Sequence, residues 1–388
     1  MTSMVSDLVV IGGGVMGLFT AYYAGEQSAR AVVLERGRIG DPRTASYGRT
    51  RSFRNDYLDA TYARLAHEAF RLWGDFERQT GSQLLVRCGC LNIGKRAITP
   101  DLGETYAQLS FETLTRLGLK TESFGAEAIR RRFSYLDADM AHLDVDSGVV
   151  DAPAVRRALT GALGERGVRT FEGIETRSIV REDGAFRVIT NAGEFLTRSL
   201  VVAAGHGTND VLTTLPGCTL RVPIIKDRPS EAKYFVPRPD ARRRFTSDVM
   251  PVIAYLDVGI YCHPIVDGLV NAVKVGYYNP PDLPRNGSGL TGIASFIEHC
   301  MPGLRDATVR DVDDVDQCDY DLVADDDFVL GPIPGVANAY VGVGWRGTGY
   351  KFAPWVGRVL AGCALQGATV YDIARFDPAR FEERALTR

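Results

Sequence analysis

The chain has 388 residues, of which 45% are hydrophobic and 24% charged. This length suggests two or three domains with a sizeable core, and the composition excludes a disordered chain, a collagen and a coiled coil. The net charge of −3 predicts no general attraction to nucleic acid or anionic lipid. Seven scattered cysteines without a C-x-x-C motif argue against a disulfide framework or a zinc ribbon, and they fit a reducing cytoplasm.

The N-terminal residues predict a β-α-β unit. An apolar run at 8–11, typical of a strand buried on both faces, precedes a glycine cluster, a helical stretch at 15–27 and a second apolar strand at 31–35. Three consecutive glycines at 12–14 interrupt the uncharged stretch 8–25. Because each glycine costs a helix about 1 kcal/mol, we expect no membrane span here. No basic residues precede the stretch and no small-residue cleavage site follows a clean apolar run, so we expect no signal peptide either.

The rest of the chain mixes both kinds of element. Helical periodicity predicts helices at 58–78, 102–117, 126–133, 152–166, 290–300 and 352–365. Strand patterns occur at 83–93, 186–190, 200–204, 251–256, 260–265, 269–278 and 339–343. The polar segment 37–55 is expected to be a loop. Strand–glycine–helix junctions near 12–17, 205–207 and 342–349 predict an α/β fold whose nucleotide-binding domain is assembled from separated pieces.

The first junction carries the motif Gly12-x-Gly14-x-x-Gly17. Gly12 permits the tight turn, Gly14 lets the backbone approach a pyrophosphate, and Gly17 lets the helix pack on the strand. The helix N-terminus offers N–H groups to phosphates, and Glu35 is placed to accept ribose hydroxyls. The motif predicts dinucleotide binding without distinguishing NAD from FAD, and the alternative is a merely tight β-α turn.

Further motifs follow in order along the chain. They are Gly48-Arg49-Thr50-Arg51-Ser52-Phe53-Arg54, Val201-Val202-Ala203-Ala204-Gly205, Lys274, Cys318, and Gly344-Trp345-Arg346-Gly347-Thr348-Gly349-Tyr350-Lys351. In this combination nearly the whole chain resembles the amine-oxidising FAD flavoproteins of the D-amino acid oxidase superfamily, especially the monomeric sarcosine oxidase and N-methyltryptophan oxidase group. That group includes imino-acid oxidases of antibiotic biosynthesis, so a role in secondary metabolism is one expectation.

The resemblance implies two domains. A discontinuous Rossmann-like FAD-binding domain would cover 1–85, 145–218 and 318–388, and a substrate domain with a large mixed or antiparallel β-sheet would cover 86–144 and 219–317. It also implies a cytoplasmic monomer whose partners are a small amino or imino acid and O2, with no nucleic acid and no membrane. We expect no metal, because the five histidines show no ligand spacing.

The cofactor is expected to be FAD. The cofactor-binding residues that the resemblance implies are Gly12, Gly14, Val15, Met16, Gly17, Glu35, Arg36, Tyr47, Arg49, Thr50, Thr176, Gly205, Cys318, Gly347, Thr348, Gly349 and Lys351. Cys318 matches a family cysteine that forms a thioether to the flavin 8α-methyl carbon, although a lone strand cysteine is more often a small core residue. The acidic run from Asp311 to Asp321 lacks the glycine and final Glu of a calcium loop, so we expect a solvated edge strand.

The substrate-binding residues that the resemblance implies are Arg54, Lys351, Tyr261 and Trp345. Arg54 and Lys351 match the family pair that contacts a substrate carboxylate. Arginine grips a carboxylate with two parallel bonds, and lysine adds a point charge. Together they imply an amino or imino acid, whereas either cation alone is as readily a solvated one.

The catalytic residues that the resemblance implies are Lys274, Arg51, Tyr278 and His263. Lys274 matches a lysine near flavin N5 whose charge would stabilise developing superoxide; the alternative is a surface lysine on an edge strand. His263 either points into the substrate cavity or is a packed, hydrogen-bonded strand histidine. Tyr47 and Tyr278 stand where sarcosine oxidase has histidines, which argues against sarcosine itself as the substrate.

The expected function is an FAD-dependent oxidase of a secondary, N-alkyl or cyclic amino acid. Hydride transfer from the C–H beside nitrogen to flavin N5 would give an imine, and O2 would be reduced to hydrogen peroxide. The protein would supply orientation, charge and exclusion of water. The alternatives are a dehydrogenase or demethylase of the same fold that passes electrons to a partner protein, and a non-catalytic flavin-binding protein.

Overall fold

The computed structural model describes residues 5–226, 232–277, 292–311 and 320–382. The chain divides into two compact units, which are Met1–Tyr47 with Val155–Arg228 and Asp319–Arg388, and Gly48–Ala154 with Pro229–Cys318. The segments 48–85 and 145–154, which the sequence interpretation gave to the FAD-binding domain, are grouped with the second unit. The Arg-rich segment after Gly48 therefore belongs to that unit.

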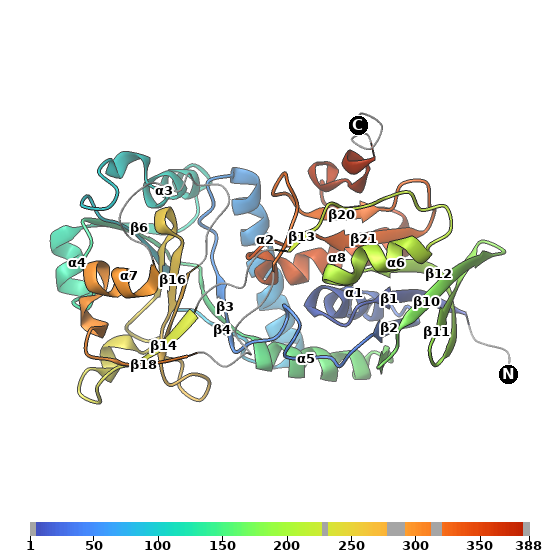
Figure 1. The fold of residues 1–388 in the computed structure, drawn as a ribbon, viewed down its shortest axis with the longest axis horizontal. Helices are drawn as coiled ribbons and strands as arrows, with labels where there is room; N and C mark the ends of the chain where they lie inside the picture. Colours follow the sequence, from blue (N-terminus) through green and yellow to red (C-terminus); the bar gives the residue numbers. More distant parts are fainter. Residues whose placement is uncertain (1–4, 227–231, 278–291, 312–319, 383–388) are drawn as a thin grey trace. The chain divides into compact units, whose positions relative to one another are not determined.

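The first unit is built on a parallel sheet (Figure 1). Its parallel strands are, in spatial order, β9 (Arg169–Glu172), β2 (Ala31–Glu35), β1 (Ser6–Ile11), β12 (Gly193–Val202) and β21 (Ala339–Val343). β20 (Val329–Pro332) adds an antiparallel edge. The first half of β12 pairs with β11 (Ala185–Thr190), which pairs with β10 (Thr176–Glu182). The central strands are almost wholly apolar because both of their faces are buried.

The helices and short elements of this unit complete the layers. They are α1 (Val15–Glu26), α5 (Ala152–Glu165, which begins in the second unit), α6 (Thr208–Thr214), α8 (Ala353–Gln366), the short helices η2 (Gly205–Gly207), η7 (Gly349–Phe352), η8 (Ala374–Phe376) and η9 (Pro378–Phe381), and the strand pair β13 (Ile225–Lys226) and β19 (Asp321–Leu322). α1 and α8 pack so closely that a side chain at Gly357 has no room: a Cβ added there would lie 2.5 Å from the Phe19 Cβ.

The three predicted strand–glycine–helix junctions lie together in this unit. β1, β12 and β21 are parallel neighbours, so their carboxyl ends meet at one edge of the sheet. A Cβ on Gly12 would lie 2.3 Å from the Ala203 carbonyl oxygen, and one on Gly349 would lie 3.3 Å from the Met16 methyl carbon. The predicted assembly of a Rossmann-like unit from separated pieces is confirmed.

The second unit contains a large mixed sheet. Its strands are, in spatial order, β18 (Thr308–Asp311), β14 (Ala232–Val236), β17 (Val273–Tyr277), β16 (Ile260–His263), β15 (Val252–Tyr255), β5 (Cys90–Gly94), β7 (Met140–Asp144) and β6 (Thr121–Gly125). All neighbours are antiparallel except β15 and β5, which are parallel. This confirms the predicted mixed sheet of a second domain.

The two faces of this sheet differ. On one face α4 (Ala126–Arg132) and α7 (Gly292–Cys300) cover an apolar core that takes alternate residues of β16 and β17 (Figure 1). Since side chains alternate along a strand, the opposite face receives the residues between them. Those residues are Tyr261, His263, Lys274 and Gly276.

A smaller sheet in the same unit corrects one sequence prediction. It consists of β3 (Thr50–Phe53), β8 (Gly148–Asp151) and β4 (Leu85–Val86), so part of the expected loop 37–55 is a strand. The prediction failed because β3 has no apolar alternation, and its polar side chains are satisfied by other residues of the unit. The remaining helices here are α2 (Ala60–Thr80), α3 (Tyr106–Arg116), η1 (Leu102–Glu104), η3 (Arg242–Phe245), η4 (Leu256–Val258) and η5 (Pro302–Leu304).

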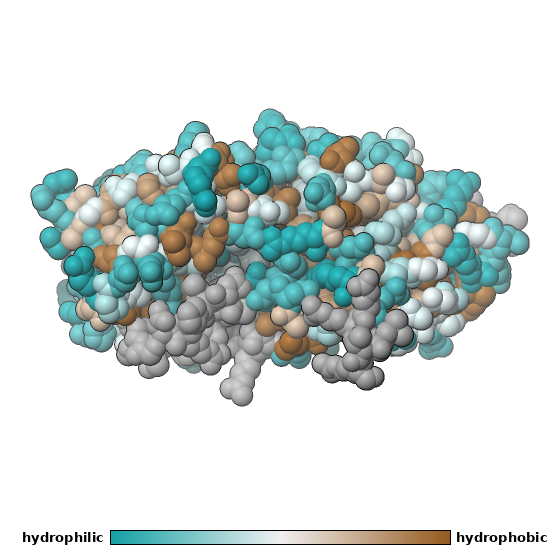
Figure 2. Space-filling view, turned by 90° about the horizontal axis from the view of Figure 1, so that it is seen from above, coloured by the Kyte–Doolittle hydropathy of each residue, from teal (hydrophilic) through white to brown (hydrophobic). Residues whose placement is uncertain are grey.

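The surface is mainly hydrophilic on the face shown in Figure 2, where brown residues form small separate groups. The large hydrophobic side chains that are exposed among the described residues are Leu109, Val180, Ile225, Val249, Val309 and Val370. No helix in the described part of the chain combines the length and the hydrophobicity of a membrane span.

Candidate active site

The glycine motif forms a close-packed cradle at the start of α1. Gly12 has φ +116°, a conformation that side chains rarely adopt, and a Cβ there would collide with the Ala203 carbonyl. A Cβ on Gly17 would lie 2.0 Å from the Gly12 oxygen. α1 begins at Val15, whose N–H donates to the Ser46 hydroxyl over 2.9 Å. Ser46 was not among the predicted residues.

Glu35 closes the cradle from β2. One carboxylate oxygen accepts the Gly13 N–H and the other accepts the Gly37 N–H, each over 2.7 Å. Arg36 approaches the turn after β12. A Cβ added at Gly207 in that turn would lie 3.8 Å from both terminal guanidinium nitrogens of Arg36. The structure thus brings predicted cofactor residues from β1, β2 and the Gly205 turn together.

Two further predicted cofactor residues, Tyr47 and Thr176, also belong to this unit. The Tyr47 ring packs against the Arg156 guanidinium, with 5.5 Å between the guanidinium carbon and the ring centre. Thr176 is the first residue of β10. A cavity of about 760 Å³ is lined by residues 36–43 together with Glu172 and Gly173. These features fit a dinucleotide, since close backbone approach, a helix N-terminus and a carboxylate are what pyrophosphate and ribose require.

With FAD as the bound dinucleotide, as the resemblance implies, we expect Gly12→Ala to lose most of the cofactor that the wild-type protein retains. A side chain at this φ costs about 1–3 kcal/mol, and its collision with Ala203 displaces the turn. Flavin absorbance per purified chain measures the loss. Gly161→Ala on α5 is the matched control, because nothing lies within 4 Å of its added Cβ. Equal flavin content in all three proteins would contradict the cradle.

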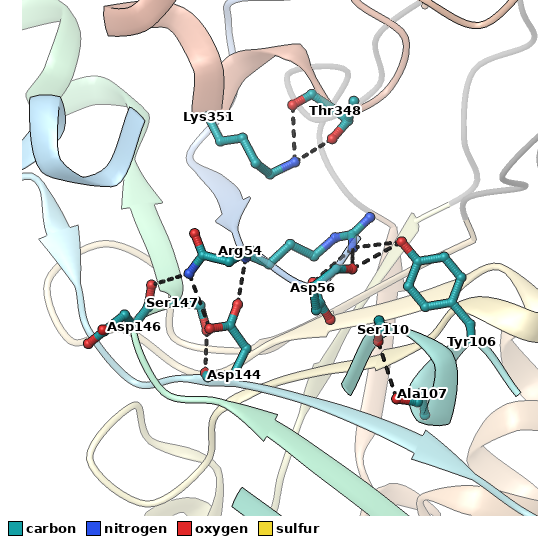
Figure 3. Close-up of polar contacts among 11 residues, drawn as sticks. Arg54, Asp56, Tyr106, Ala107, Ser110, Asp144, Asp146, Ser147, Thr348 and Lys351 are labelled. Carbon is teal, nitrogen blue, oxygen red and sulfur yellow. Dashed lines mark hydrogen bonds and ion pairs between the residues drawn. The ribbon is translucent and has the colours of Figure 1, made fainter. Parts of the chain in front are cut away.

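The turn after β21 holds the predicted residues Trp345, Gly347, Thr348, Gly349 and Lys351. The Lys351 side chain is buried, and its Nζ donates to the Thr348 hydroxyl over 2.5 Å and to the Thr348 carbonyl over 3.0 Å (Figure 3). Trp345 packs tightly on Gly349, where a Cβ would lie 2.4 Å from the Trp345 Cβ. The alternative interpretation of Lys351 as a solvated cation is therefore wrong, because its side chain is buried and hydrogen-bonded.

Lys274 lies on the polar face of the large sheet of the second unit. It is 2% exposed, and its backbone pairs with His263 on β16 and with Tyr234 on β14. The alternative of a surface lysine on an edge strand is wrong, because β17 is an interior strand. Directly opposed residues of antiparallel strands share one face of the sheet, so this face gathers a cation, an imidazole and a phenol.

Both ring nitrogens of His263 have hydroxyl partners on β3. Nδ1 lies 2.7 Å from the Thr50 Oγ1 and Nε2 lies 2.7 Å from the Ser52 Oγ. The interpretation of His263 as a packed, hydrogen-bonded histidine describes these contacts, and its catalytic role stays a prediction. Beside it, the Tyr261 ring occupies the space over Gly276, where a Cβ would lie 2.4 Å from the Tyr261 hydroxyl oxygen.

Two arginines of the Arg-rich segment Gly48–Arg54, Arg49 and Arg51, also lie in this unit. Arg49 donates from Nη1 to the Tyr234 hydroxyl over 3.5 Å, so it approaches the polar face near Lys274. Arg51 donates from Nη1 to the Thr50 carbonyl over 3.0 Å. Thr50 and Arg49 thus lie beside the polar face of the large sheet. The contact of Thr50 and of both arginines with a cofactor stays a prediction.

Arg54 is buried in an ion pair. Its Nη1 donates to an Asp56 carboxylate oxygen over 2.8 Å, to the Asp56 carbonyl over 2.7 Å and to the Tyr106 hydroxyl over 3.3 Å (Figure 3). The Tyr57 ring centre lies 4.6 Å from its guanidinium carbon. Burial opposes the charge of Arg54, but Tyr106 and Asp56 favour it, and its pKa lies well above the usual value. Sequence reasoning missed Asp56, although it stands only two positions after Arg54.

A second buried carboxylate, Asp144 at the end of β7, borders this cluster. It accepts the Asn55 backbone N–H over 2.5 Å and the Asn55 side-chain amide over 3.1 Å. Burial, together with the charge of Asp56, raises the pKa of Asp144 to about 7. Asp144 therefore titrates near neutral pH in the folded protein.

We expect Asp144→Asn to flatten the pH dependence of stability. The raised pKa means that the folded state holds a proton which the unfolded state releases near pH 4, so stability is lost as pH rises toward 7, by up to about 4 kcal/mol. Urea unfolding at about pH 5 and about pH 8 measures the difference. An unchanged difference in the variant would show that Asp144 is not the group that titrates.

Two predicted residues, Tyr278 and Cys318, lie outside the described residues. Among the residues that are described, no group of three His, Cys, Asp or Glu side chains is arranged to hold a metal ion.

The fold and the cradle are those of a dinucleotide-binding enzyme. Residues 7–362 match the family model described as FAD dependent oxidoreductase, the DAO family, and the chain belongs to this family. FAD rather than NAD is therefore its cofactor.

Relatives match over nearly the full length. Human peroxisomal sarcosine oxidase is 27% identical over 398 residues, covering 97% of this chain and 96% of the relative. An N-methyl-L-tryptophan oxidase of Yersinia pestis (strain Pestoides F) is 27% identical over 393 residues, covering 97% and 99%. The solved structure of an L-proline dehydrogenase from P. horikoshii has a TM-score of 0.80 at 20% identity, covering 98% and 99%, and it shows the fold alone.

Proposed function

We propose that the protein is an FAD-dependent oxidase of a small amine that carries a carboxylate. The observation that carries this proposal is the burial of three cations in a member of this family. Lys274, Arg54 and Lys351 are 2%, 9% and 4% exposed. Burying a charge is costly unless it is paired and hydrogen-bonded, so three cations kept in the interior are not there for solubility. The curated relatives named above are a sarcosine oxidase and an N-methyl-L-tryptophan oxidase, each named for an amino acid.

FAD, when bound, would accept a hydride equivalent from the C–H beside the amine nitrogen and return the electrons to O2. Arg54 and Lys351 would bind the substrate carboxylate, the first from its rigid fork of donors and the second as a point charge. Lys274 would stabilise the negative charge that develops on oxygen. The substrate nitrogen must be unprotonated to become an iminium, so none of these residues has to act as a strong base.

Anaerobic mixing with a panel of secondary and cyclic amino acids tests the proposal. Bleaching of the flavin by at least one carboxylated amine, and slower bleaching by the matching amine without a carboxylate, would support it. No bleaching by any member of the panel would refute it. Slow reoxidation in air after bleaching would instead favour the dehydrogenase that passes electrons to a partner protein. The monomeric state and the cytoplasmic location stay predictions.

We also propose that Cys318 holds the flavin covalently. Acid-precipitated wild-type protein should then keep its yellow colour, whereas Cys318→Ser should release the flavin into the supernatant. The matched control is Cys218→Ser, a partly exposed cysteine of the first unit. A colourless wild-type pellet would remove Cys318 from this role while leaving FAD binding intact.

A further inference from the structure

A buried carboxylate in the first unit is bonded to the turn that follows β21. Asp321 on β19 is 5% exposed. Its Oδ2 accepts the Gly344 N–H over 3.0 Å, and its backbone carbonyl accepts the Arg346 N–H over 3.0 Å. One residue thus fixes the beginning of the turn with two hydrogen bonds.

The expectation of a solvated acidic edge strand holds for Asp311 on the edge strand β18 but is wrong for Asp321, which is buried. Asp311, at the start of the acidic run, is exposed on β18, whereas Asp321 is enclosed by β13 and the turn. The positions between 312 and 319 lie outside the described residues. Solubility therefore does not explain why an acidic residue stands at position 321.

Backbone amides compensate for the burial of this carboxylate. Burial raises the pKa of Asp321 to about 6, while the amides of Gly344, Asp321 and Trp345 and the charge of His206 lower it. Lys226 on β13 pairs with Asp321 in the strand register. The carboxylate is therefore mostly ionised at neutral pH, and the turn carries a negative charge beside its N–H groups.

The turn lies at the edge of the sheet where this fold binds its nucleotide. β21 runs parallel to β12 and β1, so residues 344–349 follow a carboxyl end at the same edge as the glycine cradle. A Cβ on Gly349 would meet the Met16 side chain at the beginning of α1. A charge held at this edge acts on whatever the cradle binds.

We propose that Asp321 is a positioning residue for FAD, which orients the N–H groups of the 344–349 turn toward the flavin and lowers its reduction potential through its negative charge. The proposal rests on the assignment of this turn to the cofactor site. A nearby negative charge disfavours added electrons, so Asp321 keeps the reduced flavin ready to give electrons up.

Two substitutions separate the bond from the charge. Asp321→Asn keeps an oxygen that can accept the Gly344 N–H and removes the charge, whereas Asp321→Ala removes both. Asp325→Asn is the matched control, because Asp325 belongs to the same segment but binds the Arg380 guanidinium. The holoenzymes are compared by flavin absorption spectrum, reduction potential, sulfite affinity and thermal midpoint.

For Asp321→Asn we expect a higher reduction potential, a shifted spectrum and sulfite binding roughly threefold to tenfold tighter, the scale of one charge acting through a protein interior. Asp321→Ala should show the same changes and should also retain FAD less well, and the control should match wild type. Wild-type potential, spectrum and sulfite affinity in both Asp321 variants, with only a lower thermal midpoint, would overturn the proposal. A wild-type protein without FAD would instead refute the proposed function.

Discussion

Replacing Lys274 with methionine should slow reoxidation of the reduced protein by O2 at least about 100-fold, the effect of removing one preorganised charge from a reaction centre. Flavin reduction by the substrate should change much less, because Arg54 and Lys351, the proposed substrate anchors, are untouched. Stopped-flow measurements of the reductive and oxidative half-reactions separate the two effects.

The structure makes this variant interpretable. Lys274 lies on an interior strand, and methionine nearly preserves its volume and is compatible with burial. Lys233→Met on the neighbouring strand β14 is the control, because Lys233 is partly exposed and pairs with Asp311. If the Lys274 variant reoxidised as fast as the control, Lys274 would not act on oxygen.

Arg54→Lys should raise the KM for carboxylated substrates by about tenfold or more, with a smaller change in kcat. Lysine keeps the charge that Asp56 requires but loses the planar fork that grips a carboxylate. Steady-state kinetics on a substrate and on its carboxamide measure the effect, and only the carboxylate form should become weaker. Equal losses on both substrates would mean that Arg54 acts through folding rather than through carboxylate binding.

Arg54→Met gives a different expected result. It leaves Asp56 buried at 2% exposure without its cation, and breaking a buried ion pair costs about 3–5 kcal/mol. We therefore expect a large loss of stability from methionine and a small one from lysine. Arg71→Met on α2 is the control, because Arg71 forms exposed pairs with Glu68 and Asp75 whose removal costs little.

Long periodic segments made most of the fold predictable. The helices predicted at 58–78, 126–133 and 352–365 appear as α2, α4 and α8, and the β-α-β unit is present. β3 was missed because its hydroxyl side chains are satisfied by His263 on a distant strand, a contact that local alternation does not encode. β6 was missed for a different reason. Most of its residues are not buried, so it shows no alternation of apolar and polar residues.

The sequence predicted which residues belong to the candidate site better than it predicted which residues surround them. The motif order identified Lys274, Arg54 and Lys351, and all three are buried. Their neighbours were not foreseen, because Asp56 and Asp321 look like ordinary surface acids in the sequence. Whether an acidic residue is solvated or enclosed depends on tertiary packing, which composition and spacing do not reveal.

The parallel pairing of β12 with β21 has a consequence for how the polypeptide matures. A strand ending at Val202 is flanked by one that begins at Ala339, so the nucleotide-binding sheet stays incomplete until residues 339–343 have left the ribosome. The second unit is interrupted in the same way, since β5 pairs with β15 across some 160 positions. Neither unit can be produced alone by cutting the gene once, because each is assembled from separated segments of the chain.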